Sequence, residues 1–408
     1  MGSLEEVQCL EGHTDRVWQV AWAPSGDMLA SCGGDRTVRI WRRQPTSSQQ
    51  PAEQPQTPQQ AEQQPAEQQH QRQQQQQQED RWVCSAILED THSRTIRSVC
   101  WSPTGRFLAT ASFDRTTAIW QHQGGVWENV ALLEGHESEV KEVAWNPNGC
   151  LIATCSRDKT VWLWEAQPGN EYEVVDVKHG HSQDVKCVRW HPQGEVLASA
   201  SYDDSIKLWV DEDDEWVCAQ TLAGPGVGHT STVWELAFDA EGRRMVSCSD
   251  DGTLKIWACR KDAGRGQLRW QLLSTLTGYH GRTVFTVDWS KEGLIASGCA
   301  DNAIRIFGEA TADSAAAMDA EAVAAAADAA AAEPGLRGLF MQQQPQQQSC
   351  DSGGSSSEGG PFCLLCKREQ AHPLDVNCVR WHPTDPGLLA SAGDDCCVRL
   401  WRWHPPPA

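Results

Sequence analysis

The stretch that determines the fold is Leu29-Ala-Ser-Cys-Gly-Gly-Asp-Arg-Thr-Val-Arg-Ile-Trp41, in which an apolar run leads through a Gly-Gly-Asp turn into an alternating run. Its Asp35 stands 22 residues after His13. The chain repeats this spacing seven times, with at most one residue of drift, as His13/Asp35, His92/Asp114, His136/Asp158, His181/Asp203, His229/Asp251, His280/Asp301 and His372/Asp395. Six residues after each Asp comes an aromatic residue: Trp41, Trp120, Trp164, Trp209, Trp257, Phe307 and Trp401. The chain is therefore a tandem array of one structural unit.

Each unit has the same internal order of residue types. A β-branched residue stands four residues after the His and an aromatic residue nine after it, as Val17 and Trp22 do in the first unit. A turn, a short apolar run and the alternating run follow. This period-two patterning predicts four short antiparallel strands per unit. A unit of about 40–45 residues cannot bury its apolar face alone, so we expect the seven to stack into one closed ring.

A further signature opens the units, because Gly precedes the His in four of them, as in Gly12-His13. Together with the strand-ending aromatic residues, this resembles the WD40 family, although no unit of this chain has the Trp-Asp pair itself. The resemblance implies an all-β fold, a seven-bladed β-propeller with four antiparallel strands per blade, closed by the N-terminal segment near Val7–Leu10 beside the strand that ends at Trp401. The expected domain is 4–408, with repeats at 4–43, 81–122, 126–166, 171–211, 215–259, 268–308 and 362–403.

The repeated His and Asp, with a Ser or Thr four residues before each Asp, could suggest hydrolase triads. Seven copies of a nucleophile do not make an active site, so a structural role is the better interpretation. The WD40 resemblance implies that each set forms a hydrogen-bonded network that locks its blade. The first five sets are His13, Ser31, Asp35 and Trp41; His92, Thr110, Asp114 and Trp120; His136, Thr154, Asp158 and Trp164; His181, Ser199, Asp203 and Trp209; and His229, Ser247, Asp251 and Trp257. In the sixth unit Phe307 removes the indole N–H donor.

Two stretches interrupt the period. Residues 44–80 are rich in Gln, Pro and Glu, and residues 308–360 change from Ala-rich to Gln-rich to Gly/Ser-rich. Neither composition can bury enough apolar surface to offset the entropy of ordering, so we predict that both inserts are disordered. Both follow the third strand of a unit, which places them on one face of a propeller. We therefore expect the opposite face, called the top face below, to be the working surface.

Charge and composition restrict the partners. A net charge of −21 and a pI of about 5.0 oppose binding to nucleic acid or to anionic membranes. We expect no secretory signal, because the first residues lack its basic and apolar regions, and the sequence has no apolar run long enough to span a membrane. The 17 cysteines suit a reducing compartment, so we expect a cytoplasmic protein, with the nucleus left open.

No motif predicts a cofactor or a metal site. The chain lacks the glycine-rich patterns that bind nucleotide phosphates. One Cys-x-x-Cys, Cys363 to Cys366, and the adjacent Cys396 and Cys397 fall short of the roughly four ligands of a structural metal site. Structural cysteines are the preferred interpretation, and an iron–sulfur or zinc site and a redox pair are the alternatives.

The position five residues after each His is expected to open the innermost strand at the mouth of the central channel. It reads Trp18, Arg97, Lys141, Lys186, Trp234, Phe285 and Asn377. Aromatic residues and Arg dominate protein interfaces, which predicts a surface for acidic or aromatic C-terminal peptides and carboxylate-rich partners. The residues assigned to it are Arg16, Trp18, Arg97, Lys141, Arg157, Lys186, Tyr202, Trp234 and Phe285. The alternative is solvated loop charges with tryptophans packed between blades.

Several segments resemble one subfamily, among them Leu132-Leu-Glu-Gly-His-Glu-Ser-Glu-Val-Lys141 and Ala153-Thr-Cys-Ser-Arg-Asp-Lys159. They are similar to the WD40 subunit of the cytosolic iron–sulfur protein assembly targeting complex. The resemblance implies a non-enzymatic scaffold that binds the protein subunits of that complex and helps deliver iron–sulfur clusters to cytosolic and nuclear apoprotein clients, with Arg157 as a functional top-face residue. The alternative is a substrate receptor of a cullin-type ubiquitin ligase, for which Trp41-Arg42-Arg43 is a weak match.

Overall fold

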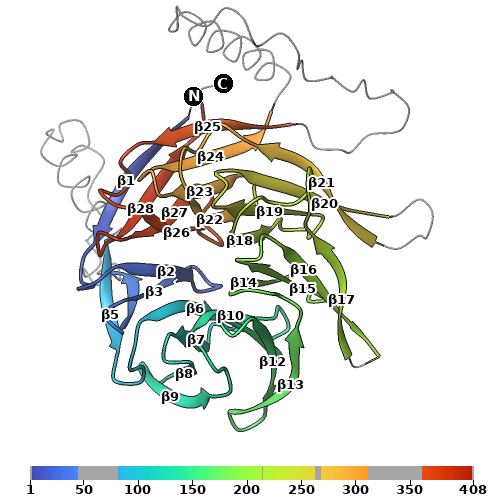
Figure 1. The fold of residues 1–408 in the computed structure, drawn as a ribbon. Helices are drawn as coiled ribbons and strands as arrows, with labels where there is room; N and C mark the ends of the chain where they lie inside the picture. Colours follow the sequence, from blue (N-terminus) through green and yellow to red (C-terminus); the bar gives the residue numbers. More distant parts are fainter. Residues whose placement is uncertain (1, 45–80, 214, 262–267, 311–360, 407–408) are drawn as a thin grey trace, which may run out of the picture.

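The computed structural model describes residues 2–44, 81–213, 215–261, 268–310 and 361–406. Within these ranges the chain forms twenty-eight β-strands and no helix. The strands make seven antiparallel four-stranded sheets, which stand around a central axis as the blades of a propeller (Figure 1). The predicted fold class is confirmed. Nearly all of both predicted inserts, 44–80 and 308–360, lies outside the described residues, although one strand continues to Glu309.

Each of the first six blades is built from four consecutive strands that run in order from the channel to the rim. The first three blades are β2 (Val17–Trp22), β3 (Met28–Gly33), β4 (Val38–Arg43) and β5 (Trp82–Leu88); β6 (Ile96–Trp101), β7 (Phe107–Ser112), β8 (Thr117–Gln123) and β9 (Val126–Leu133); and β10 (Val140–Trp145), β11 (Leu151–Ser156), β12 (Thr160–Gln167) and β13 (Glu171–His179). The next three are β14 (Val185–Trp190), β15 (Val196–Ser201), β16 (Ile206–Glu212) and β17 (Glu215–Leu222); β18 (Val233–Phe238), β19 (Arg244–Ser249), β20 (Leu254–Lys261) and β21 (Leu268–Leu276); and β22 (Val284–Trp289), β23 (Ile295–Cys299), β24 (Ile304–Glu309) and β25 (Phe362–Arg368).

The seventh blade joins the two ends of the chain. Its inner strands are β26 (Val376–Trp381), β27 (Leu388–Gly393) and β28 (Val398–His404), and its outer strand is β1 (Ser3–Leu10). The antiparallel register pairs Leu10 with Val398 and Leu4 with Trp403. The predicted closure by the N-terminal strand is therefore confirmed, and main-chain hydrogen bonds hold the ring shut.

The hydrophobic core lies between blades. Ala109 and Ile119 of the second blade form one buried cluster with Val140, Val143 and Trp145 of the third. Because a blade is covered on both sides, both faces of its central strands are apolar, and β27 has no exposed residue. Each blade is thus stabilised mainly by its two neighbours.

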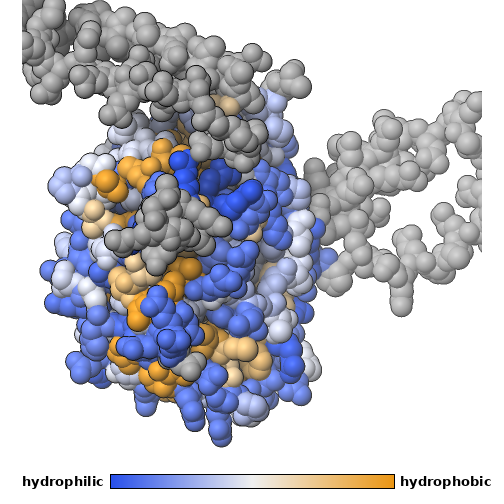
Figure 2. All heavy atoms as spheres, turned by 90° about the vertical axis from the view of Figure 1, so that its right-hand side faces the viewer, coloured by the Kyte–Doolittle hydropathy of each residue, from blue (hydrophilic) through white to orange (hydrophobic). Residues whose placement is uncertain are grey.

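The outer rim is mostly polar. Figure 2 faces the side of the ring that carries β17 and β21, where apolar groups form small patches between hydrophilic ones. Exposed apolar side chains on the outer strands include Val174, Val175 and Leu273. Scattered apolar residues of this kind are normal on a folded surface.

The predicted blade network is present as a chain of hydrogen bonds. In the third blade the Trp164 indole N–H donates to Thr154 Oγ1 at 3.0 Å, His136 Nε2 lies 2.9 Å from the same oxygen, and His136 Nδ1 lies 2.7 Å from Asp158 Oδ2. The first, second, fourth and fifth blades repeat it. The seventh blade has it as well.

The sixth blade departs further from this pattern than its Phe307 alone predicts. His280 Nε2 lies 2.9 Å from Ser297 Oγ, but its buried Nδ1 has no partner. Asp301 pairs instead with Arg305, with contacts of 3.1 and 2.5 Å. Burial and the Arg305 charge lower the pKa of His280 to about 3, so its ring stays neutral. In the seventh blade Arg399 stands at the position of Arg305 and also pairs with the carboxylate, yet His372 keeps its contact with Asp395. The loss of the His–Asp contact in the sixth blade is therefore not predictable from the arginine alone.

The two kinds of blade should respond differently to loss of the histidine. His136→Ala leaves both Thr154 and Asp158 with an unmet hydrogen bond, whereas His280→Ala does so only for Ser297. We expect His136→Ala to lower the free energy of unfolding by about 1–3 kcal/mol more than His280→Ala, measured by urea denaturation. Equal losses would show that the Asp contact adds no stability.

The network also predicts acid sensitivity. Burial alone would raise the pKa of Asp158, but hydrogen bonds from His136 and Thr160 and the His136 charge lower it to about 2 from 3.8. This carboxylate therefore stabilises the fold above about pH 4, and that contribution is lost as the pH falls toward 2. We expect the stability difference between wild type and Asp158→Asn to shrink between pH 4 and pH 2 in urea titrations, whereas the exposed control Asp90→Asn should show no such trend.

Candidate functional site at the top of the channel

A β-bulge opens every inner strand. The pairing register shifts between the first and third residues, for example between Val140 and Glu142 in β10. The same shift occurs in the other six inner strands. A bulge re-aims the extra side chain, here the second residue of the strand, which points into the mouth of the channel. These second residues are Trp18, Arg97, Lys141, Lys186, Trp234, Phe285 and Asn377.

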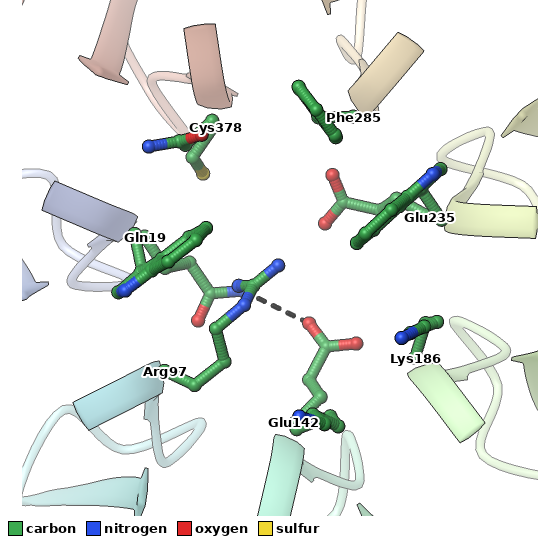
Figure 3. Close-up of a pocket in the computed structure, with 11 residues that line it drawn as sticks. Gln19, Arg97, Glu142, Lys186, Glu235, Phe285 and Cys378 are labelled. Atoms are coloured by element: carbon green, nitrogen blue, oxygen red, sulfur yellow. Dashed lines mark hydrogen bonds between the residues drawn. The ribbon is translucent and has the colours of Figure 1, made fainter. Parts of the chain in front are cut away.

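These side chains line a cavity of about 310 Å³ at the top mouth of the channel. Seven of the nine predicted surface residues take part: Arg16, Trp18, Arg97, Lys141, Lys186, Trp234 and Phe285. Phe113, Asp375, Asn377 and Asp394 complete the lining. Figure 3 looks into the narrow floor of this mouth, where each of the seven inner strands contributes one of the labelled residues.

Three cations from adjacent blades lie side by side at the mouth, and each contacts an aromatic ring. The Arg97 guanidinium lies 4.8 Å from the centre of the Trp18 ring, and Lys141 Nζ lies 4.2 Å from that of Phe113. Lys186 Nζ lies 5.1 Å from the ring of Trp234. Cation–π contacts of this kind hold long side chains in place without neutralising them. The cationic side chains are therefore preorganised for a ligand.

The other two predicted residues lie on the rim of the cavity. Arg157 is 60% exposed at its side chain and contacts Glu139 at 3.4 Å, where Arg94 also lies 3.4 Å from the same carboxylate. Tyr202 is exposed beside Lys186, whose Nζ lies 5.3 Å from the ring centre. Arg157 is thus a surface cation that a partner can reach without entering the channel.

An acidic sector faces the cationic one and was missed as part of the site. Asp394 accepts a hydrogen bond from Asn377 at 2.7 Å and lies 3.5 Å from Arg16. Asp375 lines the same cavity, and burial raises its pKa. The position just before the repeated Asp carries acids in the fifth and seventh units, so the pattern was available in the sequence.

A buried ionic network lies under the mouth and was also missed. Arg189 pairs with Glu142 and, at 2.5 Å, with Glu235, which also pairs with Arg380. Figure 3 shows the carboxylates of Glu142 and Glu235 turned toward the middle of the channel. Burial alone would raise the pKa of Glu235, but Arg380 and Arg189 keep it below its ordinary value. The sequence signal is a Glu or Arg in strands that are otherwise apolar.

The same ring of side chains joins neighbouring inner strands. Glu142 Oε2 accepts a hydrogen bond from the main-chain N–H of Val188 in the next blade at 2.9 Å, and Gln19 Oε1 accepts one from Val99 at 2.7 Å. Ser98, Glu235 and Thr286 accept equivalent hydrogen bonds from the main-chain N–H groups of the next inner strand. Because inner strands are sheet edges, these bonds satisfy N–H groups that no strand covers.

Lys141 has an unusual proton affinity for a lysine. Burial, and then the charges of Lys186 and Arg97, lower the pKa of its ammonium group to about 8. Burial also lowers the pKa of Lys186. The three cations therefore repel one another in a partly desolvated place, which favours a bound negative charge.

Other predicted features take ordinary structural positions. Cys363 and Cys366 are buried in β25. No group of three or more His, Cys, Asp or Glu in the described part of the chain is placed to hold a metal ion. In those same ranges no helix has the length and apolarity needed to cross a membrane.

A family model described as "WD domain, G-beta repeat" matches seven stretches of the chain, at residues 4–42, 82–121, 127–165, 172–210, 216–258, 270–308 and 364–402. The chain therefore belongs to the WD40 family. Propellers of this family are typically non-catalytic interaction scaffolds.

Relatives of similar length share a more particular name. The chain is 48% identical over 419 residues, covering 98% of both chains, to the Chlamydomonas reinhardtii "Probable cytosolic iron-sulfur protein assembly protein CIAO1 homolog". It is 42% identical over 412 residues to the Arabidopsis thaliana "Protein CIA1", covering 98% of this chain and 96% of the relative. It is also 42% identical to a Culex quinquefasciatus protein named as a probable cytosolic iron–sulfur protein assembly protein, with 99% of both covered. The subfamily resemblance seen in the sequence is confirmed.

The buried ionic network can be tested directly. Glu235→Gln leaves the Arg189 and Arg380 guanidiniums beside a neutral amide, and an uncompensated buried charge is strongly destabilising. We expect a loss of about 3–5 kcal/mol in the free energy of unfolding. The exposed control Glu241→Gln should change it by no more than about 0.5 kcal/mol. A similar small effect for both would show that Glu235 is not needed to compensate the two arginines.

Proposed function

We propose that this chain is a non-enzymatic scaffold of the cytosolic iron–sulfur protein assembly machinery. It would bind subunits of the targeting complex and help deliver iron–sulfur clusters, as cargo, to cytosolic and nuclear apoprotein clients. The observation that carries the proposal is full-length similarity to relatives named as cytosolic iron–sulfur protein assembly proteins. Their names support action in the cytosol, and action in the nucleus is part of the proposal.

The geometry supports a docking role for the top face. The closed ring fixes loops from all seven blades relative to one another, so a partner meets a preorganised surface. Arg157 and Arg94 provide charge at the rim, and the cation–aromatic mouth lies beside them. Acidic segments that also carry aromatic side chains would match this surface. No catalytic step and no resident cofactor are part of this proposal.

The alternative function, a substrate receptor of a cullin-type ubiquitin ligase, is not favoured. Trp41 of the supposed docking box is buried and donates its indole N–H to Ser31 at 2.8 Å within the blade network. Arg43 lies 3.3 Å from Asp385 and over the ring of Trp82. These contacts give the motif a structural explanation.

Affinity purification tests the docking role. Arg157→Glu reverses an exposed charge at the rim, so we expect recovery of iron–sulfur assembly subunits and client enzymes to fall by about tenfold or more, as loss of a charge-assisted contact would produce. The free energy of unfolding should stay within about 0.5 kcal/mol of wild type.

Arg243→Glu is the matched control, because Arg243 is also an exposed cation paired with a glutamate, Glu241, but lies in the β18–β19 turn at the opposite end of a blade. Its partner recovery should equal that of wild type. Recovery of a cullin adaptor in place of assembly subunits would contradict the proposed function. Equal losses of partner recovery in both variants would show that the top face has no specific role in docking.

A further inference from the structure

One part of the mouth has more positive charge than the protein around it balances. Arg97, Lys141 and Lys186 come from three adjacent blades and line the same cavity. In the described part of the chain, Arg97 and Lys141 have only cation–π contacts, with no hydrogen bond or ion pair. Lys186 has one carboxylate, Asp184, at 3.5 Å. A chain of net charge −21 has thus left three neighbouring cations largely unpaired.

The buried carboxylate closest to them in the chain is already engaged. Glu142 follows Lys141 and lies under the mouth, but its Oε1 accepts hydrogen bonds from Gln19 at 3.0 Å and from Arg189. Its Oε2 accepts one from the Val188 N–H at 2.9 Å. Glu142 is therefore engaged with Arg189 below the mouth. Of the two acids that line the cavity, Asp394 is engaged by Asn377 and Arg16, and burial raises the pKa of Asp375. The three cations are thus available to an anion from outside.

We propose that Arg97, Lys141 and Lys186 form a binding site for a phosphate dianion, either the phosphoryl group of a monoester or phosphate itself. Three cations that surround one cavity can each meet one oxygen of a phosphoryl dianion. A single carboxylate would offset only one of three charges. Trp18, Phe113 and Trp234 hold the cations from the sides and exclude water, which strengthens each contact.

The group could belong to a phosphorylated side chain of a protein partner or to a free phosphate. Both present the same dianion to the cations. The site stands apart from the iron–sulfur assembly role, because it rests on the charges of the mouth and not on the similarity to relatives. Rim docking at Arg157 and phosphoryl binding at Lys141 can therefore succeed or fail separately.

Proton uptake is a specific signature of this site. Burial and the charges of Lys186 and Arg97, opposed by the carboxylates of Glu139 and Asp184, lower the pKa of Lys141 to about 8, so part of Lys141 is neutral near pH 8. A bound dianion favours the ammonium form and raises that pKa, so binding takes up a proton from the buffer. The measured binding enthalpy at pH 8 must then depend on the ionisation enthalpy of the buffer.

Isothermal titration calorimetry of the full chain tests the proposal with three probes: sodium phosphate, a short alanine peptide with one phosphoserine, and the same peptide with Glu in its place. We expect a phosphorylated probe to bind about tenfold or more tightly than the Glu peptide, with proton uptake at pH 8. Phosphate binding as tightly as the phosphopeptide identifies a free phosphate as the ligand, and binding of the phosphopeptide alone identifies a protein partner.

Variants locate the site. Arg97→Gln and Lys141→Met should each weaken binding about tenfold or more, and Lys141→Met should abolish the buffer dependence. Lys291→Met removes the same charge from the β22–β23 turn at the opposite end of a blade and should leave binding unchanged. Melting temperatures of all three variants should match wild type.

Three results would overturn the proposal: equal affinity for the Glu and phosphoserine peptides, binding that survives Arg97→Gln and Lys141→Met, or no binding by any probe. The proposed assembly role is read out separately, by partner recovery with Arg157→Glu.

Discussion

Hydrogen bonds between neighbouring inner strands fix the spacing of the blades at five of the seven junctions around the channel. Glu142 accepts one from the Val188 N–H and Gln19 accepts one from the Val99 N–H, so these inner sheet edges are satisfied by a neighbouring blade instead of by water. The bulge directly above each contact then points one side chain into the mouth. The positions of the top-face groups on these blades therefore depend on the buried acceptors, and a change in one acceptor would move the surface above it.

Much of the fold could be predicted from the sequence, because the spacing of the repeated residues follows from how the strands of a blade pair. The predicted network requires His136, Asp158 and Trp164 to come together within one blade. The structure places these three residues in one chain of hydrogen bonds through Thr154. The sixth blade could not be predicted in the same way. Whether Asp301 binds His280 or Arg305 depends on a competition between two partners at similar reach, which spacing does not decide.

The site was predictable only in part, for a related reason. The position five residues after each His identified the residues that face the mouth, such as Lys141. It did not reveal that Asp375 and Asp394 face the cations, because those acids come from loops of a different blade. Nor did it reveal that Glu235 joins Arg189 and Arg380 across the channel. Contacts across a ring depend on how seven blades converge, and a single repeat contains no information on that.

The charge distribution differs between the outer surface of the protein and the mouth of the channel. A large net negative charge keeps the outer surface from associating unspecifically, whereas the mouth collects cations of adjacent blades in a small volume. Aromatic rings between the cations make this tolerable, since they attract positive charge without cancelling it. An approaching anion would then be drawn to one place on a surface that otherwise repels it.

Pairing of β1 with β28 has a consequence for biosynthesis. Leu4 and Trp403 lie at opposite ends of the chain, so the last blade cannot be completed until β28 has left the ribosome. Throughout translation β1 remains an uncovered sheet edge, the kind of surface that other chains can add to. Closure of the ring therefore waits for the strand made last, and the newly made protein is most exposed to misassociation in the interval before β1 pairs with β28.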